Sequence, residues 1–381
     1  MKTTQIIGIL IVILTLAGVA VYRFVVKPSP AGGTGGGLFP TVTVASVKGY
    51  SGGEKMGLCQ NPKILEILRK KYGLALEAQK RGSVEMVSAP APEGIDFLWP
   101  GSQTQLEIFK AGGQHSKGTE ILFNSPIVLY SWDIVVEALM KEKIVVQREG
   151  THYIVDMPRL VEAIRAKKKW KDVGLEELFG SVKVHSTDPA KSNSGSQFAA
   201  LVATVLADRE TLEPEDVAKV APTMRALFKS LGFMQGSSGD LFNQYVKQGV
   251  GAFPMVAGYE NQIIEFSLAN RAQAAAIQSK LKILYPTPTV WSSHPMIALT
   301  DNGKKLIAAL QDPEIQRIAW EEHGFRTGNA ALITDPAKLG VNGIPKTVNS
   351  IVSMPTYAVM DELIRKSTSS EAPSQPTGAT P

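Results

Sequence analysis

The sequence predicts an α/β protein, because one pattern recurs along it: a strand, a polar loop and an amphipathic helix. Residues 95–99 have the β-branched and aromatic composition of a strand, 100–102 of a turn, and 103–111 of a helix. The chain has 381 residues, of which 44% are hydrophobic, enough to fill the cores of two ordinary domains. Since strands that alternate with helices usually run parallel, we expect parallel sheets with helices on both faces.

The other elements follow the same pattern in chain order. Residues 41–47 predict a strand. Asn61 and Pro62 predict the start of a helix, with Asn as N-cap and Pro at the first helical position. Its buried stripe would be Ile64, Leu65, Ile67 and Leu68. Later repeats predict strands at 182–185 and 250–256, and helices at 196–209 and 259–269.

Two apolar runs are interrupted by proline. Residues 121–129 contain Pro126 at their middle, and residues 283–290 contain Pro286 and Pro288. Extended segments with stiff, partly kinked centres suit a chain that crosses twice between two lobes. We therefore expect lobe one to comprise residues 41–124 plus 289–365, and lobe two to comprise residues 127–284.

The first 26 residues predict membrane targeting. Residues 1–5 would be a cytoplasmic N-terminus, and residues 6–26 are almost continuously apolar and long enough to cross a bilayer. Small residues at 18–20 also offer a cleavage site, so an uncleaved anchor and a cleaved signal are both open. Either interpretation places the body in the periplasm or the extracellular space. The anchor would make the chain a single-pass protein of the cell membrane.

Two segments have the composition of unstructured chain. Residues 27–40 are rich in glycine and proline and predict a flexible linker. Residues 366–381 are rich in serine, threonine and proline and predict a disordered tail. Cys59 is the only cysteine, which excludes an internal disulfide and a thiolate metal cluster. It also lies too far from the apolar run to carry a lipid.

Composition argues against nucleic-acid and metal binding. The basic run at 165–169 follows an apolar-periodic segment, where lysine and arginine favour a helix C-terminus. No aromatic platform is interleaved with it, so we expect no nucleic-acid partner. The five histidines are scattered, with no pair at helical spacing, so we expect no metal site and no cofactor.

Polar loops at the ends of the predicted strands are the candidate ligand site, because ligands of open α/β sheets bind there. Small hydroxyl residues and glycine expose backbone N–H groups at helix N-termini, which favour an anion or a polar group. Any one such loop can also be a structural helix cap. The candidate ligand-binding residues are Ser51, Gly52, Ser83, Ser102, Ser125, Ser192, Asn193, Ser194, Gly195, Ser238, Tyr259 and Glu260.

Three stretches carry a family resemblance. Residues 187–198 (TDPAKSNSGSQF) resemble the loop and helix of bacterial extracellular solute-binding proteins of the type II periplasmic fold. Residues 249–256 with 258–260 resemble the return strand of the second lobe in that group. His294 with Pro295, and residues 324–326, are similar to its C-terminal region.

The resemblance implies a two-lobed binding protein without enzymatic activity that serves an ABC transporter permease. It is nearest to the molybdate-binding-like branch, which implies a tetrahedral oxyanion held by neutral hydroxyls and amides. The implied contacts are Ser51, Ser83, Ser125, Asn193 and Tyr259. The sequence departs from this branch at Glu260 and Asp240, whose charge would oppose an anion unless Lys55 or Lys191 offsets it.

Two other functions stay open. The same fold could act as a membrane-tethered sensor or accessory factor. A more remote alternative is a serine hydrolase, because Gly49, Ser51 and Gly53 fit the pattern G-x-S-x-G. That motif turns directly into a helix, whereas the next helix signal here waits until Asn61. The base would have to be His294 or His323.

Overall fold

The computed structural model describes residues 44–328 and 334–368. The predicted membrane segment at 6–26 and the linker at 27–40 lie outside these ranges, as does the tail beyond 368. None of the helices within the described ranges combines the length and the apolar character needed to cross a bilayer.

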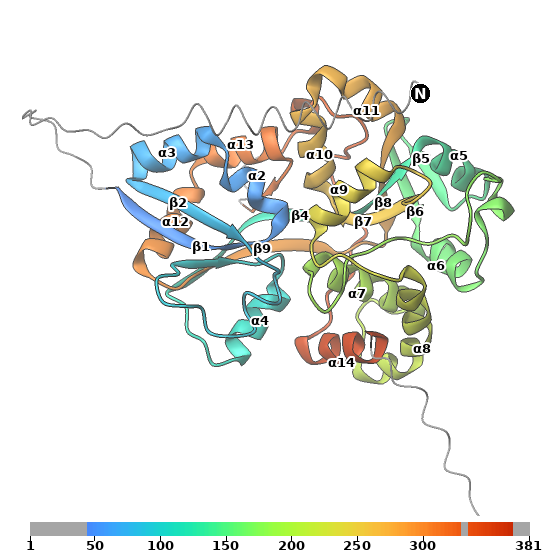
Figure 1. Ribbon diagram of the computed structural model, residues 1–381, viewed down its shortest axis with the longest axis horizontal. Helices are drawn as coiled ribbons and strands as arrows, with labels where there is room; N and C mark the ends of the chain where they lie inside the picture. The colour runs from blue at the N-terminus through green and yellow to red at the C-terminus, as the bar shows by residue number, and fades with distance from the viewer. Residues whose placement is uncertain (1–43, 329–333, 369–381) are drawn as a thin grey trace, which may run out of the picture. The chain divides into compact units, whose positions relative to one another are not determined.

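The first sheet is built mainly from the two ends of the chain (Figure 1). Strand β1 pairs in parallel with β2 and β3, and β9 runs antiparallel to both β3 and β4. A short strand, β10, also pairs with β4. The strands are β1 (Ala45–Ser51), β2 (Leu74–Lys80), β3 (Phe97–Trp99), β4 (Gly118–Trp132), β9 (Trp291–Ala298) and β10 (Arg326–Thr327).

The second sheet comes from the middle of the chain. Strand β4 pairs antiparallel with both β7 and β8, β8 is parallel to β6, and β6 is antiparallel to β5. Its further strands are β5 (Val145–Arg148), β6 (His152–Asp156), β7 (Met255–Tyr259) and β8 (Leu281–Thr287). Both sheets are therefore mixed, and the expectation of parallel sheets holds only for the β1–β2, β1–β3 and β6–β8 pairs. The chain passes between the sheets through strands of opposite direction, which requires antiparallel pairs.

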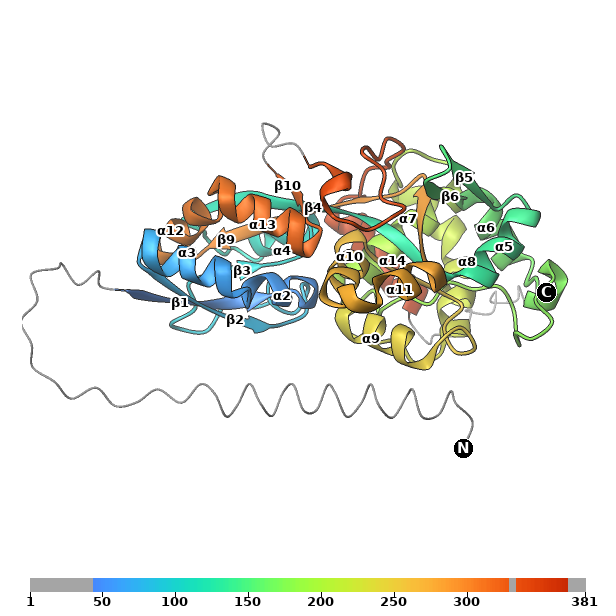
Figure 2. The same ribbon diagram turned by 90° about the horizontal axis from the view of Figure 1, so that it is seen from above.

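Strand β4 belongs to both sheets (Figure 2). Its residues up to Pro126 pair with β9, and its residues from Ile127 onward pair with β7 and β8. Leu129 pairs with Leu284, so the two proline-interrupted runs lie side by side. We call the first sheet with its helices the first lobe, and the second sheet with its helices the second lobe. The residue boundaries proposed from the sequence stay a prediction.

Helices cover the sheets of both lobes (Figure 1). Around the first sheet are α2 (Met56–Cys59), α3 (Pro62–Tyr72), α4 (Gln103–Ala111), α12 (Asp301–Leu310) and α13 (Pro313–His323). Around the second are α5 (Asp133–Lys141), α6 (Met157–Arg165), α7 (Asn193–Ala207), α8 (Pro214–Leu231), α9 (Ser238–Gln248), α10 (Glu260–Ala269), α11 (Ala274–Lys280) and α14 (Tyr357–Thr368). Short 3₁₀ turns lie at Gly53–Lys55, Trp170–Val173, Arg271–Gln273 and Pro336–Lys338.

Local signals placed some helices correctly. The Asn61 side chain caps α3 by accepting hydrogen bonds from the backbone N–H groups of Lys63 and Ile64. Helix α4 has the predicted bounds, 103–111. Other elements moved: the predicted strand at 182–185 forms only a single bridge, between His185 and Val256. Strand β7 begins at Met255 rather than at 250.

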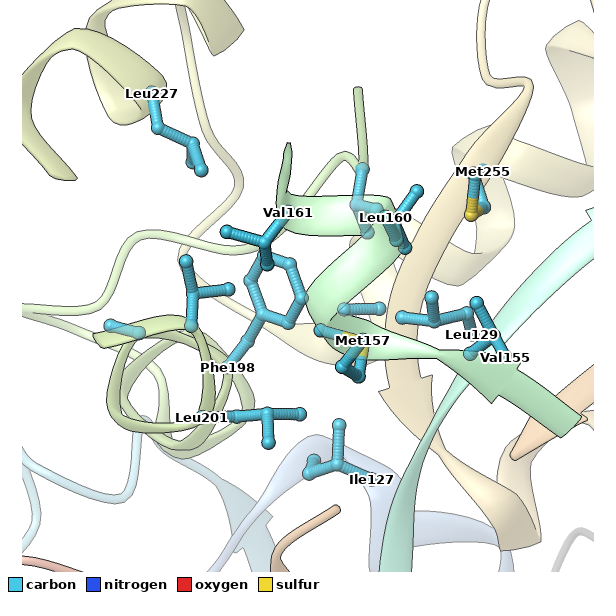
Figure 3. Packing of buried hydrophobic residues seen from close by; sticks show 14 of the residues in the cluster. Ile127, Leu129, Val155, Met157, Leu160, Val161, Phe198, Leu201, Leu227 and Met255 are labelled. Atoms are coloured by element: carbon cyan, nitrogen blue, oxygen red, sulfur yellow. The ribbon is translucent and has the colours of Figure 1, made fainter. Parts of the chain in front are cut away.

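Each lobe has its own apolar core. In the first lobe, Phe97, Trp99 and Phe123 pack with residues of α12 and α13. In the second lobe, Phe198 of α7 points toward α6 and packs with Val161 (Figure 3). Separate cores allow the lobes to keep their internal structure if the segments between them bend.

The C-terminal segment differs from the expectation. Residues up to 365 were assigned to lobe one, but α14 packs against α8 and α7 of the second lobe. Its apolar stripe, Val359, Met360 and Leu363, is buried in the core that contains Phe198. Just before it, Thr289 pairs with residues 350–352 through two backbone hydrogen bonds of 2.9 Å. Residues 366–368, which were predicted to belong to the disordered tail, are helical, because α14 continues to Thr368.

A buried ion pair holds the region where the lobes meet. Arg326 of β10 binds Glu260, the first residue of α10, through Nε–Oε2 at 2.7 Å and Nη2–Oε1 at 2.8 Å. Tyr285 donates to the same carboxylate at 2.7 Å. Burial alone would lower the pKa of the Arg326 guanidinium, but Glu260 raises it above its usual value. The charge of Glu260 is therefore offset by Arg326 rather than by Lys55 or Lys191.

We expect Arg326→Met to lower the free energy of unfolding by about 3–5 kcal/mol, because it leaves the Glu260 carboxylate buried and unpaired. Urea denaturation followed by far-UV circular dichroism measures the loss. The matched control is Arg317→Met, since Arg317 pairs with Glu321 on the surface. That variant should cost less than about 1 kcal/mol. Equal losses in the two variants would show that the buried pair has no special structural role.

Candidate functional site between the lobes

A small cavity of about 20 Å³ lies where loops of the two lobes meet. The first lobe contributes the turn after β1 and the loop after β2, and the second contributes the loops that lead into α7 and α9, together with the end of β7. The lining residues are Gly52, Gly53, Glu54, Lys80, Arg81, Gly82, Ser83, Ser192, Asn193, Gly236, Ser237, Ser238 and Tyr259. This volume suits an ion or a molecule of few atoms.

Three helices of the second lobe begin at this cavity. Ser192, Ser237 and Tyr259 are the N-cap residues of α7, α9 and α10, and all three line it. The unpaired N–H groups and the dipole of a helix N-terminus favour negative charge. Three such ends from one lobe therefore create a positive potential toward the loops of the other.

Asn193 connects the two lobes within the site. Its Nδ2 donates to Tyr259 Oη at 2.9 Å and lies 3.4 Å from Ser292 Oγ on β9. Ser292 in turn donates to the carbonyl of Gly101. A Cβ atom on Gly101 would lie 2.5 Å from Asn193 Nδ2, so glycine is needed for this close approach. The first residue of α7 is thus held against the first lobe.

Glu54 and Lys55 form a buried ion pair beside the cavity. Lys55 Nζ donates to Glu54 Oε1, lies 3.4 Å from the Pro100 carbonyl and 3.3 Å from His294 Nδ1. Burial would raise the pKa of the Glu54 carboxyl, but Lys55 and His294 hold it well below its usual range. Burial, with the charge of Lys55, lowers the pKa of the His294 imidazole to about 4. At neutral pH the cluster of Glu54, Lys55 and His294 therefore carries no net charge.

Direct hydrogen bonds also join the lobes around the site. Asn261 Nδ2 donates to the Glu54 carbonyl at 3.1 Å, and its backbone N–H lies 3.4 Å from Ser125 Oγ. Lys80 binds both oxygens of Asp240 at 2.9 Å. The negative charge of Asp240 is therefore offset by Lys80. Neither lysine that we expected in this role takes it, because Lys55 pairs with Glu54 and Lys191 with Asp188.

Several buried polar atoms around the site have no hydrogen-bond partner among the described residues. They are Asn193 Oδ1, Asn261 Oδ1, Ser237 Oγ and His294 Nε2. An unpaired buried polar group costs about 1–3 kcal/mol, so native proteins normally pair such groups with protein, water or ligand. Their concentration between the lobes indicates a place for polar contacts.

The predicted ligand-binding residues divide into two groups. The cavity is lined by Gly52, Ser83, Ser192, Asn193, Ser238 and Tyr259. The other six do not line it, and their surroundings are other parts of the protein. Ser51 Oγ donates to Gly52 O, and Ser102 Oγ donates to Gln105. Ser194 Oγ is hydrogen-bonded to Thr187 Oγ1. Ser125 accepts from Asn261, Gly195 lies against the Thr187 carbonyl, and Glu260 binds Arg326.

Sequence reasoning missed three lining side chains: Glu54, Lys80 and Arg81. Lys80 is the last residue of β2 and Arg81 follows it, where the loop after a parallel strand faces the site, so their position offered a signal. The position of Glu54 offered no such signal, because a carboxylate is expected beside an anion site only when the buried cation that pairs with it is known.

The hydrolase alternative gains no support from the geometry. Ser51 is fully buried, and its Oγ lies 3.9 Å from Cys59 Sγ. Burial raises the pKa of the Cys59 thiol to about 12. His294 contacts Lys55, and His323 contacts Glu265 at 2.7 Å and Asn61 at 2.8 Å. Both candidate bases are therefore engaged away from Ser51.

No family model and no curated protein matches the chain. Solved structures do match. The sulfate-binding protein SubI from Mycobacterium tuberculosis is 14% identical, with a TM-score of 0.51 over 83% of this chain and 96% of its own. Apo ferric ion-binding protein A from Pasteurella haemolytica is 16% identical, with a TM-score of 0.52 over 86% and 99%.

The periplasmic binding protein AfuA from Actinobacillus pleuropneumoniae, with fructose-6-phosphate bound, is 12% identical, with a TM-score of 0.54 over 84% of this chain and 96% of its own. The chain has the type II periplasmic solute-binding-protein fold. At these identities the likeness establishes the fold alone. The match covers nearly the whole length of each of these solved chains. The molybdate-binding-like branch within it stays a prediction.

We expect the stability of the protein to fall as the pH is lowered from 6.5 to 5. The folded His294 has a pKa of about 4 against an ordinary 6.5, so in this window the unfolded state binds a proton that the folded state does not. His185, whose pKa burial also lowers to about 4, adds to the effect. Urea denaturation at both pH values measures it, with about 1–2 kcal/mol expected from each histidine.

His294→Gln should reduce this pH dependence, and His115→Gln, at an exposed position, should leave it unchanged. A His294→Gln variant with the full pH dependence would contradict the buried neutral imidazole.

Proposed function

We propose that this chain is an extracytoplasmic solute-binding protein that captures a small oxyanion between its lobes for an ABC-type uptake system. It performs no chemistry on its ligand. The proposal rests on one observation: three helix N-termini of the second lobe meet the Gly52–Glu54 and Lys80–Ser83 loops of the first lobe around buried, unpaired polar atoms.

The charge balance supports an anion. Glu54 is paired with Lys55, and Glu260 with Arg326, so neither carboxylate acts as an isolated negative charge. The helix N-termini are then the main uncompensated field in the site. Among proteins of similar fold, the solved structures include a sulfate-binding protein and one with bound fructose-6-phosphate. Hydroxyls and amides around the cavity suit a tetrahedral oxyanion of the kind that the molybdate-binding-like branch holds.

Ligand capture would work through closure of the lobes. Two of the connections between the lobes are β4, near Pro126, and the segment between β8 and β9. Bending of these segments opens and closes the site. A ligand stabilises the closed form only through contacts that exist there, and Asn193 supplies such a contact because it reaches Ser292 of the other lobe. The closed form then docks on a membrane permease.

The second candidate function is a membrane-tethered sensor or accessory factor that uses the same site. It is favoured by the predicted anchor at 6–26 followed by a flexible linker at 27–40. The partner distinguishes the two functions. Copurification of the full chain with an ABC permease supports uptake, and copurification with a signalling protein supports the sensor.

We expect Asn193→Ala to weaken ligand binding about tenfold, because it removes a hydrogen bond that joins the lobes. Mass spectrometry of natively purified protein identifies the carried ligand. Titration calorimetry with that ligand, and with molybdate, sulfate and phosphate, compares the variant with wild type. Ser88→Ala is the control, since Ser88 Oγ donates to the Val84 carbonyl on the surface. If Asn193→Ala binds with unchanged affinity, the proposed cavity is not the ligand site.

We also expect the full chain to stay in the membrane fraction when membranes are washed with carbonate, because residues 6–26 would span the bilayer. Deletion of residues 1–26 should release the body to the soluble fraction. Release of the intact full-length chain by carbonate would contradict the anchor, and a mature N-terminus near Val21 would establish the cleaved signal instead.

A further inference from the structure

A second and larger cavity lies within the second lobe. Its volume is about 450 Å³, inside the range of small-molecule sites. Its walls come from four segments: the β5–β6 turn, α10, the α11–β8 junction, and residues 336–344. None of its lining residues lines the cavity between the lobes.

The walls of this cavity combine an apolar floor with a polar rim. Five lining residues are members of one buried apolar cluster: Ile263, Leu281, Ile283, Val341 and Ile344. At the rim, Gln147, Gln278 and Asn342 provide carboxamides or backbone amides. An apolar pocket with a few placed polar groups is the usual composition of a small-molecule site.

Among the described residues, Lys282 is the only charged one that lines the cavity, and no aspartate or glutamate lines it. Lys282 Nζ donates to the backbone carbonyl of Gln278 at 2.8 Å. Across residues 44–328 and 334–368 it makes no salt bridge with a carboxylate, whereas its neighbour Lys280 binds Asp133 at 2.8 Å. Lys282 also interacts electrostatically with Asp133, whose salt-bridge partner is Lys280. An ammonium that lines an apolar cavity and makes no salt bridge of its own favours an anionic ligand.

The cavity is held open by fixed contacts. Gln278 Nε2 donates to the Gly340 carbonyl at 3.2 Å, and Gln278 Oε1 accepts from the Asn342 N–H at 3.3 Å. Trp320 Nε1 donates to the Asp335 carbonyl at 3.0 Å, which holds the start of the same segment. A pre-organised wall lowers the entropy that a ligand loses on binding.

We propose that this cavity is a second binding site, for a small amphipathic monocarboxylate. The carboxylate binds Lys282, and the apolar body of the ligand packs on the floor formed by Ile283 and Ile344. The site lies within one lobe, so it does not depend on the function proposed for the cavity between the lobes.

The test uses 3-phenylpropionate as the probe, titrated into the full chain in detergent and followed by calorimetry. We expect saturable one-to-one binding with a Kd below about 1 mM, in keeping with a ligand of this size. Lys282→Met should weaken binding at least about tenfold, since it removes the positive charge. Lys280→Met is the matched control and should bind like wild type. The uncharged 3-phenylpropanamide should bind about tenfold more weakly than the acid.

Two further variants locate the bound probe. Ile344→Trp fills the cavity and should abolish binding, with near-UV circular dichroism to verify that the variant is folded. Asn193→Ala, which alters the cavity between the lobes, should leave binding unchanged. The proposal is overturned by the absence of saturation at about 10 mM probe, by an unchanged affinity of Lys282→Met, or by equal binding of acid and amide. Loss of binding in Asn193→Ala would place the probe between the lobes and also overturn it.

Discussion

The buried pair of Glu260 and Arg326 is the constraint on which the arrangement of this protein most depends. A carboxylate at the start of α10, buried between strands of two lobes, is tolerated only because a guanidinium binds both its oxygens. Arg326 comes from β10, which pairs with the first-sheet half of β4, whereas α10 packs in the second lobe. One ion pair thus connects the two lobes and sets the position at which Tyr259, the N-cap of α10, meets the cavity.

The same guanidinium also holds the C-terminal segment. Arg326 donates to the carbonyls of Pro345 and Lys346, immediately after the residues that close the larger cavity. The start of α10 and the wall of that cavity are therefore positioned by one side chain. Helix α10 lies between the two cavities, since Tyr259 lines one and Ile263 the other. Any displacement of α10 would change the walls of both.

The site between the lobes is polar without being strongly charged. Its carboxylates are paired with Lys55, Lys80 and Arg326, and burial keeps the His294 imidazole neutral at pH 7 by lowering its pKa to about 4. Three helix N-termini, together with Arg81 in the wall of the cavity, are the source of positive potential. The proposed oxyanion would be held mainly by directed hydrogen bonds, which ties its affinity to the geometry of closure.

The sequence by itself determined the α/β class, the cap at Asn61, the bounds of α4 and six of the lining residues, because these depend on local backbone preferences and on the periodicity of apolar residues. Only the tertiary structure decided the rest. Glu54, Lys55 and His294 meet across 239 positions of sequence separation, and α14 packs on α8 rather than in the first lobe. Charge pairing and helix docking depend on which surfaces approach each other in space. Local propensity reflects only neighbouring residues, so it cannot identify partners that are far apart in the sequence.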